Sequence, residues 1–274
     1  MFGLHYLSVI LSKAKDPEKR RKHENTGSFV VQLPGRKVFW FGAYMKEKAL
    51  AFLNKDYLLN VDMIECIRRD ICQIVYASDE AVLIAADGGW VWMLSCEDRA
   101  LGLALIRTHQ PPWVVLHQMD MREGLAGLGY RVGDECWQGA YTKTTPMEET
   151  LADIRQLDRS YAKRIDENYD LDDEEGITAL LDEGIICGAF VNGELAGFMG
   201  RHPEGSLGML FVFPQFRRLG IAEALERNYV NRELAQGNVP YGQIFVGNEA
   251  SRRLQEKLGM DFSEKNICWC GKSE

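Results

Sequence analysis

A short glycine-containing segment, residues 212–222, has the clearest chemical potential in this chain. It reads Val-Phe-Pro-Gln-Phe-Arg-Arg-Leu-Gly-Ile-Ala. Gly220 lets the backbone approach a ligand closely, and the adjacent guanidinium groups of Arg217 and Arg218 supply fixed positive charge. A helix that begins just after the glycine points unpartnered N–H groups outward, and such a helix start binds phosphate oxygens. The spacing therefore predicts a cradle for a pyrophosphate.

Two secondary-structure elements are expected to hold this cradle. Residues 207–212 form an apolar run of strand length, and Pro214 ends the strand because proline has no N–H to donate. A helix is then predicted as far as about Ala235, because apolar residues recur at helical spacing. These residues are Ile221, Ala222, Leu225, Tyr229 and Val230.

At these residues the chain resembles the GNAT superfamily of acyl-CoA-dependent N-acyltransferases. The family signature is Arg or Gln, two residues, Gly, one residue, then Gly or Ala, and it is met by Arg217, Gly220 and Ala222. A Val-x-Pro precedes it at 212–214. Residues 248–260 resemble the Asn-containing helix of the family, which ends in Leu-Gly-aromatic. The match of two motifs at the expected separation is a stronger signal than either motif alone.

The sequence departs from the family at two positions. Met260 stands where an aromatic residue is common, and Gln255 stands where many members have a tyrosine thought to protonate the leaving thiolate. Tyr241, Cys268, Cys270 or water are the alternatives for that acid. The two cysteines are expected in the core, and no metal site is expected, because they lack the second ligand pair of a zinc site.

The resemblance implies an α+β GNAT fold, with a mixed, mostly antiparallel sheet flanked by helices. It implies transfer of an acetyl or other short acyl group from acyl-CoA, the co-substrate, to a primary amine of a small molecule or amino acid. The amine would attack the thioester directly in a ternary complex. The residues that would bind acyl-CoA are Leu210, Phe211, Val212, Arg217, Arg218, Leu219, Gly220, Ile221, Ala222 and Asn248.

The resemblance also gives three catalytic candidates, Glu204, Val212 and Ser251. The backbone N–H of Val212 would polarise the thioester carbonyl. Some members place a glutamate base just ahead of this strand, but the closest register match is near Ser206, so Glu204 needs a shifted turn or a bridging water. Ser251 lies on the helix that flanks the CoA arm. As alternatives, proximity alone could supply most of the rate, and Asn248 could simply cap its helix.

Composition limits the partners. The chain has 274 residues, a net charge of -8 and a pI near 5.3, which argues against nucleic acid as the main partner. Seven cysteines, an odd number, and no convincing signal peptide indicate reduced thiols in a cytoplasm. No apolar segment is long enough to span a membrane. An apolar face at Leu4, Leu7 and Leu11 is expected to pack on the body or on a partner subunit, so a homodimer is an open option.

The length predicts two domains, residues 1–140 and 141–274. In the second, helices are expected at 147–162 and 173–181, and Asn192-Gly193 predicts a hairpin. An acidic run from Asp166 to Glu175 between these helices is interpreted mainly as a solvated loop.

The first half weakly repeats this order, which suggests an internal duplication, although chance is a rival explanation. Where a cradle should stand it has Ser-Cys-Glu-Asp-Arg-Ala-Leu-Gly at 95–102, and acidic side chains there would oppose a pyrophosphate. The first half is therefore expected to be a non-catalytic GNAT-like domain, as in the glycine N-acyltransferase-like branch of the superfamily. An unrelated α+β domain is the alternative.

Two other functions stay open. The chain could bind acyl-CoA as a regulatory module without turnover, an option favoured by the missing tyrosine. It could also acylate a protein amine, with the first half recognising the polypeptide.

Overall fold

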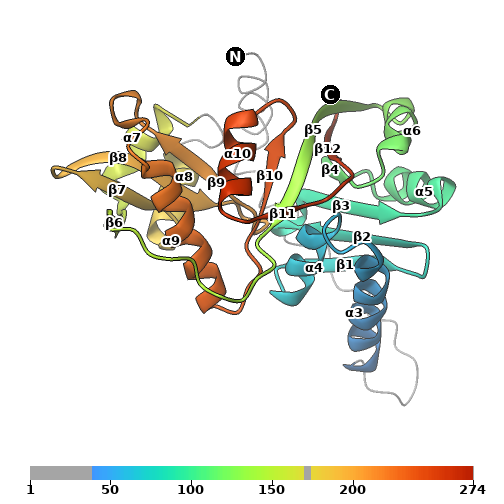
Figure 1. Ribbon diagram of the computed structural model, residues 1–274. Helices are drawn as coiled ribbons and strands as arrows, with labels where there is room; N and C mark the ends of the chain where they lie inside the picture. The colour runs from blue at the N-terminus through green and yellow to red at the C-terminus, as the bar shows by residue number, and fades with distance from the viewer. Residues whose placement is uncertain (1–38, 170–173, 274) are drawn as a thin grey trace. The chain divides into compact units, whose positions relative to one another are not determined.

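The computed structural model describes residues 39–169 and 174–273, which form two compact units (Figure 1). The N-terminal unit comprises residues 39–138 and 263–273, and the C-terminal unit comprises residues 139–262. Residues 263–273 therefore belong to the N-terminal unit, whereas the sequence-based prediction placed all of 141–274 in the second domain. The proposed helix at Leu4 to Leu11 and the acidic residues 170–173 lie outside the described residues.

The N-terminal unit combines helices with strands. In chain order its elements are α3 (Phe39–Leu53), η1 (Asn54–Asp56), α4 (Val61–Arg68), β1 (Cys72–Ala77), β2 (Ala81–Ala86), η2 (Asp87–Gly89), β3 (Val91–Cys96), α5 (Arg99–His109), β4 (Trp113–Leu116), η3 (Met119–Met121), α6 (Arg122–Gly127), β5 (Tyr130–Ala140) and β12 (Ile267–Lys272).

The strands of this unit follow the order β1-β2-β3-β4-β12-β5. Only β3 and β4 run parallel, and the helix α5 connects them; the other pairs are antiparallel. All six residues of β2 are buried. Cys268 and Cys270 of β12 lie fully buried in the hydrophobic core, as predicted.

The C-terminal unit has the same kinds of element. In chain order they are β6 (Asp153–Gln156), η4 (Arg159–Tyr161), α7 (Ala162–Asp166), α8 (Glu174–Asp182), β7 (Cys187–Val191), β8 (Glu194–Arg201), β9 (Leu207–Val212), η5 (Pro214–Phe216), α9 (Ile221–Ala235), β10 (Tyr241–Phe245), α10 (Glu249–Lys257) and β11 (Asp261–Phe262).

Its strands follow the order β10-β9-β8-β7-β6, and β11 pairs with Gly139 and Ala140 at the end of β5. The β9–β10 pair is parallel and is connected by α9; the pairs from β9 to β6 are antiparallel. Both units thus contain three antiparallel strands followed by a helix and a parallel fourth strand. The mixed, mostly antiparallel sheet with flanking helices confirms the predicted α+β fold class.

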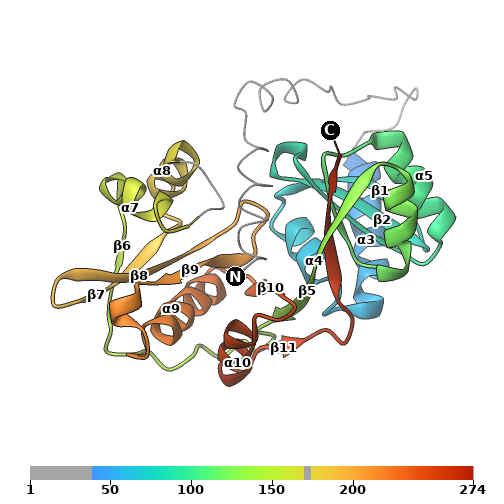
Figure 2. The same cartoon turned by 90° about the horizontal axis from the view of Figure 1, so that it is seen from above.

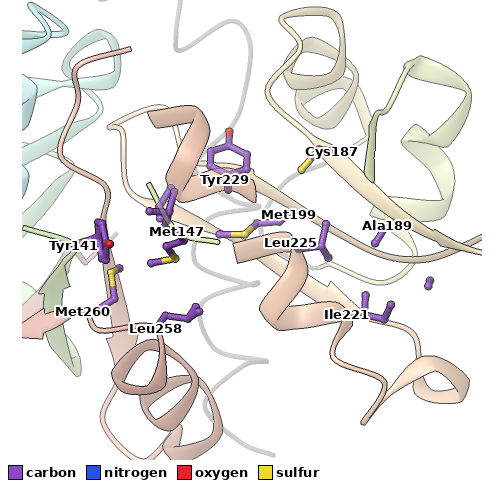
Figure 3. Packing of buried hydrophobic residues seen from close by; sticks show 13 residues of the cluster. Tyr141, Met147, Cys187, Ala189, Met199, Ile221, Leu225, Tyr229, Leu258 and Met260 are labelled. Carbon is purple, nitrogen blue, oxygen red and sulfur yellow. The ribbon is translucent and has the colours of Figure 1, made fainter. Parts of the chain in front are cut away.

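Helices cover both faces of β7–β9 in the C-terminal unit, with α7 and α8 on one face and α9 on the other (Figure 2). The α9 face packs Met199 of β8 against Leu225 and Tyr229 of α9 (Figure 3). The opposite face packs Phe198 and Met209 against Ile165 and Ile177 of the two short helices. The adjacent residues Phe198 and Met199 therefore pack on opposite faces of the sheet, as the alternation of side chains along a strand requires.

The predicted hairpin is confirmed. Strands β7 and β8 pair antiparallel on either side of Asn192 and Gly193, which have φ angles of 51° and 81°. A type I′ turn needs positive φ at both central residues, and asparagine and glycine tolerate it best.

The helix predicted at 147–162 is wrong. Residues 153–156 instead form β6, which pairs with the edge of β7, and Leu151 is fully exposed. The side chain of Asp158 accepts a hydrogen bond from the Ser160 N–H and begins a new helical turn there. The apolar spacing fitted a helix, but β6 supplies partners for backbone groups of β7, and Asp158 as a cap starts the helix late.

No described helix has both the length and the apolar content needed to cross a membrane. Within the same residues, no group of three or more His, Cys, Asp or Glu side chains could hold a metal ion, and none of the seven cysteines forms a disulfide.

A buried ion pair connects α4 to the end of β4 in the N-terminal unit. Nε2 of His117 lies 2.9 Å from Oδ1 of Asp62, Nδ1 lies 3.0 Å from the Leu94 carbonyl oxygen, and both side chains of the pair are fully buried. Burial alone would lower the pKa of His117, but the charge and hydrogen bond of Asp62, with backbone bonds to Leu94 and Val115, outweigh burial and raise it. Both ring nitrogens face oxygen acceptors, and the raised pKa favours the imidazolium form, which can donate from both.

We predict that His117→Ala lowers the free energy of unfolding of the N-terminal unit by about 3–5 kcal/mol, because it leaves a buried carboxylate without its counter-ion. Calorimetric unfolding of the full chain would measure the loss, with the exposed Arg155→Ala as control. The difference from wild type should be full below the ordinary pKa of histidine and should shrink as the pH rises through the raised pKa. A loss no larger than that of the control, or one independent of pH, would contradict this role.

Candidate functional site

Strands β9 and β10 separate almost as soon as they meet. Their parallel ladder has one register pair, Gly242 with Leu207. The N–H of Phe213 donates to the carbonyl of Ala196 on the β8 side. Because successive strand residues direct their N–H and C=O groups to opposite sides, those of Val212 and Leu210 point away from β8. These backbone groups therefore face the side where β10 has left the ladder.

A β-bulge marks the middle of β9. Gly200 of β8 pairs with Gly208, and Phe198 pairs with Phe211, so three steps along β9 face two along β8. Met209 has a positive φ of 55°, which is rare outside glycine, and its N–H donates to the Tyr169 hydroxyl at 3.0 Å. The bulge bends β9 and sets the direction of the residues that follow it.

The predicted cradle lies where this strand leads into α9. Arg218 and Gly220 both have positive φ, 64° and 78°, so the chain turns sharply just before the helix. Gly220 is the N-cap and offers no side chain to the helix, and the first helical bond runs from the Ala224 N–H to the Gly220 carbonyl. The N–H groups of the first turn, those of Ile221 to Glu223, thus have no helical partner. A methyl group placed on Gly220 would meet no atom within 4 Å, so the backbone is open at this point.

Two exposed arginines flank the open helix start. Nε of Arg217 donates to the Val212 carbonyl oxygen at 3.2 Å, which ties the guanidinium to the end of β9. Arg218 and Leu219 are also exposed, Leu219 by 61% of its surface. The segment thus places backbone donors and the positive end of a helix dipole close in sequence to two arginines, of which Arg217 is held by its bond to Val212.

The corresponding helix start in the N-terminal unit is occupied by its own chain. The carboxylate of Asp98 accepts from the N–H groups of Ala100 and Leu101, at 2.8 and 3.2 Å, and so caps α5. The backbone donors that an anion would need are therefore used, and an acidic charge stands in its place. The incompatibility of this segment with a pyrophosphate stays a prediction, and the Asp98 cap is consistent with it.

The catalytic candidates are spread along the unit. Glu204 lies in the turn before β9 and is 5% exposed; its carboxylate accepts from the Ser206 hydroxyl at 2.6 Å, and its carbonyl accepts from the Tyr241 hydroxyl at 2.7 Å. Val212 is at the other end of β9, which places it about 16 Å beyond Leu207. Glu204 and the Val212 N–H are therefore not brought together.

The helix α10 holds the other two candidates. The Asn248 side chain accepts from the Ser251 N–H at 3.2 Å, so Asn248 is the N-cap of α10, which was one of the two roles expected for it. The side-chain oxygen Oδ1 of Asn248 is therefore already occupied by this hydrogen bond. Ser251 lies in the first turn and is half-buried.

Glu226 on α9 is a functional candidate that sequence reasoning missed. It is 1% exposed, and among the described residues neither carboxylate oxygen has a partner within normal hydrogen-bond geometry. Burial raises the pKa of Glu226 to about 8, while the neighbouring amide of Gln255 lowers it in part. One signal was present in the sequence: Glu226 is four residues from Ala222 and from Val230, so a charged residue interrupts an apolar stripe of the helix.

The comparisons with known proteins agree with this architecture. The family model described as FR47-like protein matches residues 184–270. No curated protein matches the chain. A solved Drosophila protein is 15% identical with a TM-score of 0.56, over 85% of this chain and 96% of that one.

The solved structures of two GCN5-related N-acetyltransferases are also similar to this chain. That of Sphaerobacter thermophilus is 16% identical with a TM-score of 0.50, over 82% of this chain and 91% of its own. That of Kribbella flavida is 12% identical with a TM-score of 0.50, over 85% and 96%. With the parted strands and the open helix start, these likenesses identify the fold of this chain as that of the GNAT superfamily.

Proposed function

We propose that this protein transfers a short acyl group, most simply acetyl, from acyl-CoA to an amine of a small molecule or amino acid, and that the C-terminal unit carries the reaction. The observation that supports this most is the open helix start of α9 beside the unpaired edge of β9. An elongated ligand with a pyrophosphate at one end and amides along its arm fits these two features. Bound acyl-CoA would supply the activated thioester.

The residues of the chain would hold such a ligand mainly through the backbone. The first-turn N–H groups of α9, with Arg217 and Arg218, would bind the pyrophosphate. The N–H and C=O groups of Leu210 and Val212 would pair with the amides of the arm, because β10 leaves that side of β9 open. Phe211 directs its backbone groups to β8, so it would contribute only through its side chain.

One of these two N–H groups, that of Val212 or that of Leu210 two residues before it, would polarise the thioester carbonyl instead of pairing with an amide of the arm. Glu204 lies in the turn at the opposite end of β9 from Val212, so a role for Glu204 as the base would need a chain of bridging waters to the amine. Alternatively, the amine loses its proton to solvent and proximity supplies most of the rate. Ser251 is retained as a residue that would contact the arm from α10.

We further propose that the N-terminal unit is a GNAT-like domain without a CoA site. The shared order of three antiparallel strands, a helix and a parallel strand supports the duplication, and the Asp98 cap supports the loss of binding. The seven free thiols suit a reducing compartment such as the cytoplasm.

A regulatory acyl-CoA-binding role is the second candidate. It is favoured by Gln255, which cannot donate a proton as the tyrosine of many family members is thought to do. Binding of acyl-CoA without consumption across a broad panel of amines would support this second role over the first.

We predict that CoA and acetyl-CoA stabilise the protein by roughly 2.7 kcal/mol at a hundredfold excess over the dissociation constant, seen as a raised unfolding temperature. The double variant Arg217→Ala/Arg218→Ala should lose this shift. Arg155→Ala/Arg159→Ala, which removes two exposed arginines paired with Asp153 and Asp182, is the matched control and should keep it. No shift for the wild-type protein with any acyl-CoA would contradict the proposed function.

Titration calorimetry should give one CoA site per chain, because the start of α9 combines an uncapped first turn with two arginines, whereas Asp98 caps the start of α5. The Arg217→Ala/Arg218→Ala variant should weaken that one site. Two sites per chain, or one site that the double variant leaves unchanged, would show that the start of α9 is not where CoA binds.

A further inference from the structure

The side chain of Glu226 is a buried acid with no hydrogen-bond partner, a costly arrangement that calls for an explanation. The amide of Gln255 on α10 lies beside it without a hydrogen bond of normal geometry, and Oε1 of Gln255 is also buried without a partner. The side chains of Glu226 on α9 and Gln255 on α10 thus lie together, and three of their oxygen atoms are buried without a hydrogen-bond donor. A catalytic role is one explanation for such groups in a native structure.

The position of Gln255 relates this pair to the opening between the strands. A methyl group placed on Gly242 would stand 3.4 Å from the Leu207 carbonyl oxygen and 3.5 Å from Nε2 of Gln255. Gly242 and Leu207 are the register pair after which β9 and β10 part. The Glu226–Gln255 pair therefore lies at the vertex of the opening, where its two strands begin to diverge.

Charged neighbours do not account for the buried acid. Burial and the amide of Gln255 are the causes that act on its pKa. Several charged side chains of α9, α10 and β8 form ion pairs of their own: they are Glu223 with Arg227 and Lys257, Arg252 with Glu256, Arg201 with Glu233, and Glu194 with Arg164. Strands β9 and β10 carry no charged residue. Of the other titratable groups on the strands, Tyr241 donates its hydroxyl to Glu204, and burial raises the pKa of Cys187.

We propose that Glu226, in its protonated form, is the proton donor to the thiolate that leaves during acyl transfer, in the role that a tyrosine at position 255 would otherwise fill. This rests on the proposed function. Gln255 is shorter than tyrosine and has no acidic proton, so the neighbouring carboxyl group is the acid that remains at the vertex. The thiolate leaves from the carbonyl carbon, so a proton donor at the vertex requires Leu210, and not Val212 at the far end of β9, to polarise the thioester carbonyl. A carboxylic acid kept neutral by an apolar site can donate a proton near neutral pH.

The proton balance is as follows. The amine nitrogen forms a bond to the carbonyl carbon, the C–S bond breaks, and its electron pair goes to sulfur. Sulfur takes the proton of the Glu226 carboxyl group and leaves as a thiol. The proton lost by the amine nitrogen passes to water, and the Glu226 carboxylate recovers a proton from solvent after the products leave.

The test compares Glu226→Gln with the wild type and with Glu256→Gln, a control one residue from Gln255 whose side chain is 49% exposed. Three quantities are measured for each: affinity for CoA by calorimetry, kcat with acetyl-CoA and an accepted amine from pH 6 to 9.5, and the infrared band of a protonated carboxyl group in the ligand-free protein. The band needs no turnover. It should disappear with rising pH near 8 in the wild type and control, and it should be absent from Glu226→Gln.

We expect Glu226→Gln to bind CoA as the wild type does but to lose about 10²-fold in kcat, the lower end of acid–base effects, because a thiolate is a good leaving group. The kcat of the wild type should fall above about pH 8, whereas that of Glu226→Gln should not. If Glu226→Gln binds CoA normally and its kcat and pH profile are unchanged, the role of Glu226 is overturned but the proposed function is not. Loss of CoA binding with kcat would also overturn it, in favour of a structural role. A wild type that binds no CoA would overturn the proposed function and this inference together.

Discussion

The parting of β9 from β10 is the constraint on which the candidate site depends. A backbone N–H or C=O removed from a ladder must find another partner, because a buried unpaired group costs free energy. After the Gly242–Leu207 pair, the groups of Leu210 and Val212 face away from β8 with no partner strand. Nε of Arg217 satisfies the Val212 carbonyl, and the rest of that edge is available to a ligand. The bulge at Met209 and its bond to Tyr169 set the direction of the same residues.

The helices α5 and α9 differ in how the N–H groups of their first turns are treated. In the C-terminal unit, Gly220 contributes no side chain, so the first-turn N–H groups of α9 stay available. In the N-terminal unit, Asp98 fills the first turn of α5 with its own carboxylate. A single residue type at the N-cap thus separates a start that can bind an anion from one that is capped for stability.

Local signals predicted the elements around the site well. The run 207–212 is β9, the helix ends at Ala235 as expected, and Asn192-Gly193 forms its hairpin, because turn chemistry and apolar spacing act over a few residues. Long-range pairing was less predictable. The helix at 147–162 was wrong because pairing with β7 decided the conformation of 153–156, and no local signal placed 263–273 with the N-terminal unit.

The local conformation around the proposed site was predictable where it consists of backbone and glycine, and not where it depends on burial. The strand end, the turn and the helix start followed from the order of Pro214, the arginines and Gly220. That this segment binds a pyrophosphate stays a prediction. The burial of Glu226 depends on how α9 and α10 pack, so its sequence position gave only a hint. The roles of Glu204 and Ser251 stay predictions, because the acceptor amine would be positioned by side chains that no motif fixes.

Hydrogen exchange of the full-length protein with and without CoA is the most direct test of the central claim, that the edge of β9 and the start of α9 hold acyl-CoA. The account predicts slower exchange with CoA for amides in residues 207–224, and no change for residues 95–102. Unchanged exchange at 207–224, or protection centred on 95–102, would contradict it.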